Sequence, residues 1–337
     1  MFKFPKLSRL FKSQNKFARV VAKTLSTPAP KRTKPRSNRS RGKTILAEVT
    51  GFGSNPGRLI MKLYAPGQAS ANPPLVVVLH GCGQTAESLD AASGFTTLAR
   101  KRGFILLYPE QTEGNNARRC FNWFRPSAVA RDRGEVMSVH HMIEHACGRH
   151  RVDRSRIYIV GLSAGAALVS ALVATYPERF AGAAMIAGMP FGAARDAMSA
   201  LRAMRSGVSK APGEWGSLVR NVSPTAMLWP PISIWQGSGD RVVNPTNASS
   251  SAAQWLDVTG TGESEGKITM KRWGTLTRWK SARSPAVSLY SLDGFGHGLP
   301  IRGAATGKRP NVSDPYVLQA AISAPLELLR IWGLKKV

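Results

Sequence analysis

The pentad Gly161-Leu162-Ser163-Ala164-Gly165 matches the G-x-S-x-G pattern, in which a serine on a sharp strand-to-helix turn attacks a carbonyl carbon. The turn strains the serine backbone and leaves no space for a side chain at either glycine. A second match, residues 262–266, lies in a polar segment whose two glutamates would repel a developing oxyanion. We therefore expect Ser163 to be the nucleophile and Ser264 to lie in a surface turn.

A serine hydroxyl is a weak nucleophile until a histidine takes its proton, and a carboxylate must orient that histidine. His297 is the only histidine after Ser163, and it lies in a Gly-rich segment directly after the apolar run 287–292. The sequence therefore predicts His297 as the base.

Four aspartates after Ser163 are candidates for the carboxylate. Asp240 follows the apolar run 232–235, so it should lie at the carboxyl edge of the sheet, where catalytic residues gather. Asp293 is the main rival, because it lies four residues before the predicted base. Asp257 falls late in a helical segment and Asp314 precedes a proline, so we expect Asp240 to take this role.

Acyl transfer also needs preorganised N–H donors for the oxyanion. The N–H of Ala164, directly after the nucleophile, is one candidate, and the N–H of Cys82 is the other. Gly81 and Gly83 leave the Cys82 backbone accessible, and we expect His80 to fix this loop rather than to transfer protons.

A different chemistry is suggested by residues 141–145, which fit the H-x-x-E-H pattern of inverted zinc peptidases. His141 and His145 lie one helical turn apart, a spacing that can hold zinc. No distal carboxylate is marked near Glu178 or Glu214, so a solvated helix face is the preferred interpretation. We expect no metal and no cofactor, and keep the zinc peptidase as a remote alternative.

Apolar strands alternate with helical segments from about residue 44 onward. This alternation predicts an α/β fold with a mostly parallel sheet and helices on both faces. Residues 109–131 are expected to be loop-like, and 198–228 to form an insertion or lid. The predicted strands are 75–79, 104–108, 156–160, 182–187, 232–235 and 287–292, and the predicted helices are 85–102, 133–148, 164–175, 247–257 and 315–332.

Composition limits the remaining classes of protein. The 337 residues are 43% apolar, enough for a large core, and no apolar run approaches the roughly 20 residues of a membrane span. Three cysteines without a CxxC pair argue against a disulfide scaffold and against structural zinc.

The charge is concentrated in residues 1–43, which hold 14 of the 47 Lys and Arg residues and no acidic residue. We expect this leader to be disordered, and the catalytic domain to span 44–337. The leader is expected to be either a solvated tail or a segment attracted to an anionic surface or polymer granule. No motif supports specific nucleic-acid recognition. The leader also lacks the apolar core of a signal peptide.

Several motifs, in order, resemble those of the poly(3-hydroxybutyrate) depolymerase-type esterases, relatives of the feruloyl and acetylxylan esterases. They are LVVVLHGCGQTAESLD, FILLYPEQ, CFNWF, RIYIVGLSAG, TYPERFAGAA, GDRVVNPTNA and GFGHG, and together they span about 45–300.

The resemblance implies an α/β-hydrolase fold and a metal-independent serine carboxylesterase acting on a small ester or oligoester. Short hydroxyalkanoate oligomers, feruloyl esters and acetyl esters are all open as substrates. It implies Ser163, Asp240 and His297 as the triad, with Cys82 and Ala164 as oxyanion donors.

The resemblance also implies that Trp123 lies near the acyl pocket and that Cys82 and Cys120 form a disulfide, leaving Cys147 over. The family resemblance implies an extracellular location. The absence of a clear signal-peptide pattern favours the cytoplasm as the alternative. Relatives commonly carry a Trp shortly after the catalytic histidine, where this chain reads GHGLPIRG. About 40 residues follow His297, too few for a linker and polymer-binding domain, which argues against attack on crystalline polymer.

Overall fold

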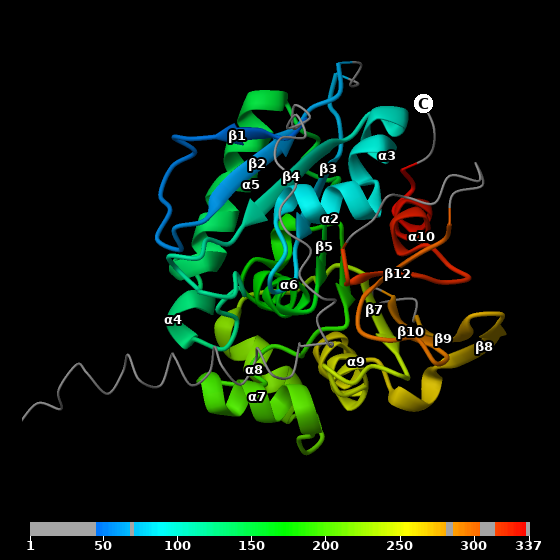
Figure 1. Ribbon diagram of the computed structural model, residues 1–337. Coiled ribbons are helices and arrows are strands. Elements are labelled where there is room, and N and C mark those ends of the chain that lie inside the picture. The colour runs from blue at the N-terminus through cyan, green and yellow to red at the C-terminus, as the bar shows by residue number, and fades with distance from the viewer. Residues whose placement is uncertain (1–44, 68–70, 281–285, 304–313, 335–337) are drawn as a thin grey trace, which may run out of the picture.

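A ten-stranded sheet with helices on both faces forms the centre of the molecule (Figure 1). This computed structural model describes residues 45–67, 71–280, 286–303 and 314–334, so the leader 1–43 lies outside the described residues. The strand order is β1-β2-β4-β3-β5-β6-β7-β10-β9-β8. The central strands from β4 to β10 are parallel, whereas the pairings at both margins are antiparallel. The predicted fold class is confirmed.

The strands of this sheet are β1 (Ala47–Val49), β2 (Ile60–Tyr64), β3 (Leu75–Leu79), β4 (Ile105–Glu110), β5 (Ile157–Leu162), β6 (Gly182–Ile186), β7 (Ile232–Gly237), β8 (Lys267–Lys271), β9 (Gly274–Trp279) and β10 (Val287–Leu292). A separate parallel pair consists of β11 (Leu299–Ile301) and β12 (Val317–Gln319).

The helices are α2 (Ala86–Ser93), α3 (Phe95–Arg102), α4 (Pro126–Val129), α5 (Gly134–His150), α6 (Ala164–Thr175), α7 (Ala197–Ser206), α8 (Glu214–Val222), α9 (Thr246–Thr259) and α10 (Ala324–Ile331). Two short 3₁₀ turns cover Pro177–Arg179 and Glu263–Glu265. No helix in the described ranges is long and apolar enough to cross a membrane.

Each face of the sheet has its own hydrophobic core. Successive side chains of a strand point to opposite faces, so Leu75, Val77 and Leu79 of β3 enter one core, and Val76 and Val78 enter the other. Helices α5, α6, α8 and α9 pack on the first face, and α2, α3 and α10 on the second. Burial on both faces explains why the central strands are continuously apolar.

Two predicted helices were wrong in extent. The segment 85–102 is divided into α2 and α3 by Gly94, whose backbone is left-handed with φ 74°. The predicted C-terminal helix 315–332 shrinks to α10, because residues 317–319 form β12 instead. At Gly94 the cause is local, since its amide bonds to the Asp90 carbonyl and ends α2 with a left-handed glycine. At 317–319 the pairing of β12 with β11 overrides the local helical pattern.

The segment 198–228 contains α7 and α8, which lie at the lower side of the view in Figure 1. The amide of Asn244 donates to the carbonyl of Met204 at 2.7 Å, so the end of α7 is tied to the loop that follows β7. Short α4 falls within the expected loop 109–131.

Candidate active site

Ser163 lies between β5 and α6 with φ 55° and ψ −118°, a conformation that non-glycine residues rarely adopt. A Cβ atom on Gly161 would overlap the backbone of Gly165, and a Cβ on Gly165 would lie 2.5 Å from the Leu79 carbonyl oxygen. The two glycines therefore permit the close packing of strand and helix that holds the serine in this turn. Ser264, in contrast, lies in an exposed 3₁₀ turn.

His297 reaches Ser163 from the turn after β10. Its Nε2 lies 3.0 Å from Ser163 Oγ, and its Nδ1 lies 2.8 Å from Asp240 Oδ2. Asp240 follows β7, the strand next to β10. A Cβ on Gly237 would overlap the Phe295 carbonyl, so glycine lets the two loops meet backbone to backbone.

The Asp240 carboxylate is buried and surrounded by donors. Oδ1 accepts from the amides of Val242 at 2.8 Å and Val243 at 2.9 Å, and Oδ2 accepts from Gln236 Nε2 at 2.9 Å. Burial acts to raise the Asp240 pKa, but His297 and the amides of Val243 and Val242 outweigh it and hold the pKa below its usual value. An ionised Asp240 places the His297 proton on Nδ1 and leaves Nε2 free to accept from the serine.

The other three candidate aspartates are not bonded to His297. Asp293 is exposed. Asp257 pairs with Arg220 at 3.2 Å, and Asp314 accepts from Gln84 Nε2 at 2.9 Å. The structure therefore brings Asp240, and none of these three, to the His297 ring.

The loop after β3 lies directly beside Ser163, since a Cβ on Gly81 would be 3.5 Å from Ser163 Cβ. The Gly81 amide donates to Gln84 Oε1 at 2.6 Å, and the Gly83 amide donates to the Arg118 carbonyl at 2.7 Å. Within the described part of the chain, the Cys82 amide between them has no acceptor. The Ala164 amide, in the first turn of α6, has no partner in the helix.

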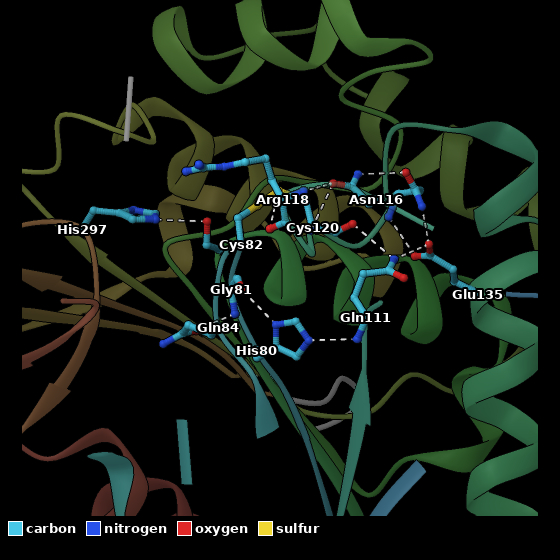
Figure 2. Close-up of a disulfide and its surroundings, with 12 residues drawn as sticks. His80, Gly81, Cys82, Gln84, Gln111, Asn116, Arg118, Cys120, Glu135 and His297 are labelled. Atoms are coloured by element: carbon cyan, nitrogen blue, oxygen red, sulfur yellow. Dashed lines mark hydrogen bonds between the residues drawn. A yellow bond between two sulfur atoms is a disulfide. The ribbon is translucent and has the colours of Figure 1, made fainter. Parts of the chain in front are cut away.

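His80 is buried beneath this loop (Figure 2). Its Nδ1 contacts the Gly81 carbonyl at 2.8 Å, and its Nε2 accepts from the Gln111 amide at 3.0 Å. Burial lowers the His80 pKa to about 4, so the ring is neutral near pH 7. This residue is placed to fix the loop, as the sequence suggests.

A disulfide joins Cys82 to Cys120, across 38 residues, and ties the loop after β3 to the segment after β4 (Figure 2). Cys147 is the free cysteine, buried on α5, and burial raises the pKa of its thiol to about 11.

Trp123 is buried in a small apolar cluster that includes Ala164, Met189, Met204 and Val243. This cluster brings together the residue after Ser163, the end of α7 and the loop after Asp240. Trp123 therefore packs among residues of α6 and α7, near Ser163.

Asn122, the residue before Trp123, donates to a buried carboxylate that was not among the predicted site residues. Glu135 is fully buried and accepts from the Asn122 amide at 2.8 Å, from Asn122 Nδ2 at 2.6 Å and from Gln111 Nε2 at 2.7 Å. Burial raises the Glu135 pKa to about 7. The polar residues inside two motifs, Gln111 in FILLYPEQ and Asn122 in CFNWF, were the available signal.

The alternative zinc site finds no support in the contacts of α5. Glu144 pairs with Arg154 at 2.9 Å and with Arg179 at 3.2 Å. In residues 45–67, 71–280, 286–303 and 314–334, no three His, Cys, Asp or Glu side chains are grouped so that they could hold a metal ion.

Comparisons with known proteins identify the family of this chain. The family described as esterase PHB depolymerase matches residues 59–275. Poly(3-hydroxyalkanoate) depolymerase C of Paucimonas lemoignei is 38% identical over 86% of this chain and 70% of its own length. Feruloyl esterase B of Talaromyces stipitatus is 30% identical over 76% of this chain and 72% of its own length.

Among solved structures, the acetyl xylan esterase of Aspergillus awamori aligns with a TM-score of 0.72. It is 23% identical and covers 86% of this chain and 99% of its own, which establishes a common α/β-hydrolase fold. The chain is a carboxylic ester hydrolase and belongs to the PHB depolymerase esterase family.

Proposed function

We propose that this esterase is a serine carboxylesterase that works through an acyl-enzyme. Ser163 Oγ attacks the ester carbonyl carbon while His297 Nε2 takes its proton. His297 then returns the proton to the leaving alcohol. In the second half-reaction His297 takes a proton from water, which attacks the acyl-enzyme, and the acid is released from Ser163. Asp240 stabilises the imidazolium, and the amides of Cys82 and Ala164 stabilise the oxyanion.

The observation that carries the proposal is the unbroken hydrogen-bonded path from Ser163 through His297 to Asp240, with steps of 3.0 Å and 2.8 Å. The 3.0 Å distance lies in the range over which a base can take a hydroxyl proton, and the 2.8 Å distance is that of a hydrogen bond that orients the base. The strained backbone of Ser163 supports the same assignment.

As substrates we propose short hydroxyalkanoate oligomers or related esters. The support is the identity with the P. lemoignei depolymerase. Feruloyl and acetylxylan-type esters are the alternative, favoured by the relatives with those names. The apolar cluster around Trp123 would form a wall for the acyl group in either case.

For the domain organisation, we propose that 44–337 is the catalytic domain and 1–43 a separate basic leader. The leader's 14 cations without an acid support attraction to an anionic surface or polymer granule. No specific nucleic acid is proposed as a partner.

The test is labelling by a fluorophosphonate, which reacts with an activated serine. Stoichiometric labelling is expected in the wild type and in a Ser264→Ala control, and none in Ser163→Ala. A zinc peptidase would instead lose its activity to a chelator and keep it in Ser163→Ala. Absence of labelling at Ser163 would overturn the proposal.

A further inference from the structure

Arg118 carries a positive charge beside the proposed oxyanion loop. Figure 2 shows its side chain running from the segment before Cys120 toward the side of the site on which His297 lies. The mechanism proposed above does not use this residue.

The backbone of Arg118 is held firmly in place. Its carbonyl accepts from the Gly83 amide at 2.7 Å, and its amide donates to Asn116 Oδ1 at 3.0 Å. Two residues later, Cys120 is joined to Cys82 by the disulfide. The base of the Arg118 side chain is therefore fixed beside the loop that carries the proposed oxyanion donor.

Among the residues that the structure describes, the guanidinium has no anionic partner. All 19 Asp and Glu residues lie in the described ranges, and none of them forms an ion pair with Arg118. Its Nε is buried and has no acceptor among the described residues. The neighbouring Arg119, in contrast, pairs with Glu113 at 3.0 Å. The two terminal nitrogens of the Arg118 guanidinium are not buried in this way and form no hydrogen bond with the described residues, so they are the donors that a ligand can reach.

The charge of Arg118 acts on Tyr316, a residue that packs against the His297 ring. Tyr316 packs edge-on against the His297 ring, with centroids 6.0 Å apart. Burial raises the Tyr316 pKa, and the positive charge of Arg118 opposes this rise, so the guanidinium acts on the same region. Because His297 would protonate the leaving oxygen, the alcohol portion of the ester would pass through this region.

We propose that Arg118 binds the free carboxylate of a hydroxy-acid leaving group, which rests on the proposed serine esterase function. In a linear 3-hydroxyalkanoate, the ester oxygen is attached to carbon 3 of the next unit, two carbons from its carboxyl carbon. An arginine can hold such a carboxylate through two parallel hydrogen bonds. The enzyme would then preferentially hydrolyse the last ester bond at the free carboxyl end of an oligomer. Acetyl and feruloyl esters of neutral sugars offer no such group.

The experiment compares the linear 3-hydroxybutyrate dimer, as the free acid, with its methyl ester, using the full chain. The wild type should prefer the free acid through a lower KM. Arg118→Gln should lower the free-acid to methyl-ester ratio of kcat/KM by about 10- to 100-fold. Arg118→Lys, which keeps the charge, should retain an intermediate ratio, and the matched control Arg119→Gln should retain the wild-type ratio.

Two results would overturn the proposal: a wild type without preference for the free acid, or equal losses on both esters in Arg118→Gln. If Arg118→Gln fails to fold, the wild-type ratio and Arg118→Lys still decide the question. Failure of the serine mechanism would look different, because neither ester would be hydrolysed and Ser163 would not be labelled.

Discussion

His80 Nδ1 lies 2.8 Å from the carbonyl oxygen of Gly81, and this carbonyl belongs to the same planar peptide group as the N–H of Cys82. Since the Gln111 amide donates to His80 Nε2 at 3.0 Å, the ring proton is on Nδ1 and is donated to Gly81. The bond fixes the orientation of the peptide plane and polarises its N–H. His80 is therefore placed to position the proposed oxyanion donor without contact with the substrate.

Replacing His80 with Gln should lower kcat on a soluble p-nitrophenyl ester by about 10- to 100-fold, with little change in KM. The donor acts mainly on the oxyanion, so its misplacement should weaken the transition state more than the bound ester. Steady-state kinetics with melting temperatures would measure this, and His141→Gln on α5 is the control. A raised KM with an unchanged kcat would contradict the positioning role.

For the carboxylate, Asp240→Asn should lower kcat by roughly 10⁴, the loss expected when a triad histidine is held in the wrong tautomer. Substrate binding should change little. Asp293→Asn, in the exposed part of the His297 turn, serves as the control and should keep near-normal activity. Comparable kinetics in the two variants, or a larger loss in Asp293→Asn, would reverse the assignment.

Local patterns were sufficient to predict the central strands and the serine turn. The continuous apolar run of β3 and the small residues of α6 fit only a buried environment, and the matching helix 164–175 is confirmed. The break at Gly94 has a local signal, since glycine commonly ends a helix in the left-handed conformation, and the prediction of one helix overlooked it. The strand β12 could not be predicted, since it depends on pairing with β11.

The site residues also differ in how far the sequence predicts them. His297 could be predicted because it is the only histidine after Ser163, and Asp240 because it follows a strand. The Glu135 carboxylate and the unpaired charge of Arg118 depend on which side chains meet in three dimensions. Residue spacing does not indicate that an arginine lacks an ion pair among the described residues. Nor does it indicate that donors from separate segments converge on one buried carboxylate.

The close packing of the serine turn predicts a large effect from a single methyl group. Gly165→Ala would place Cβ 2.5 Å from the Leu79 carbonyl oxygen and 2.6 Å from that of His80. We expect a loss of about 1–3 kcal/mol in the free energy of unfolding, together with lower activity. Gly148→Ala on α5 is the control, because its Cβ meets nothing within 4 Å and alanine favours a helix. Equal melting temperatures for the two variants would refute the packing argument.

Glu135 predicts a pH dependence of stability. Its pKa of about 7 in the folded protein exceeds the ordinary value of 4.5, so the folded state binds this proton more tightly than the unfolded state. The stabilisation from this group is therefore complete below pH 4.5 and is lost as the pH rises to about 7, by up to roughly 3 kcal/mol.

Denaturant titrations of the wild type and Glu135→Gln between pH 4.5 and 8 would isolate this contribution. As the pH rises, the free energy of unfolding of the wild type should fall relative to that of Glu135→Gln. The exposed Glu263→Gln should show a constant difference from the wild type. A constant difference in Glu135→Gln as well would show that Glu135 titrates alike in both states.

The basic leader should affect adsorption and leave catalysis intact, because every residue proposed for the triad and the oxyanion site lies beyond residue 75. A chain that starts at Thr44 should hydrolyse a soluble p-nitrophenyl ester at the full rate. It should lose salt-sensitive binding to vesicles that contain anionic lipid, since each cation near such a surface contributes roughly 1 kcal/mol within a Debye length of about 8 Å. Cosedimentation at low and high salt would measure the loss, with neutral vesicles as the control. Equal binding by the full and shortened chains at both salt concentrations would show that the leader is only a solvated tail.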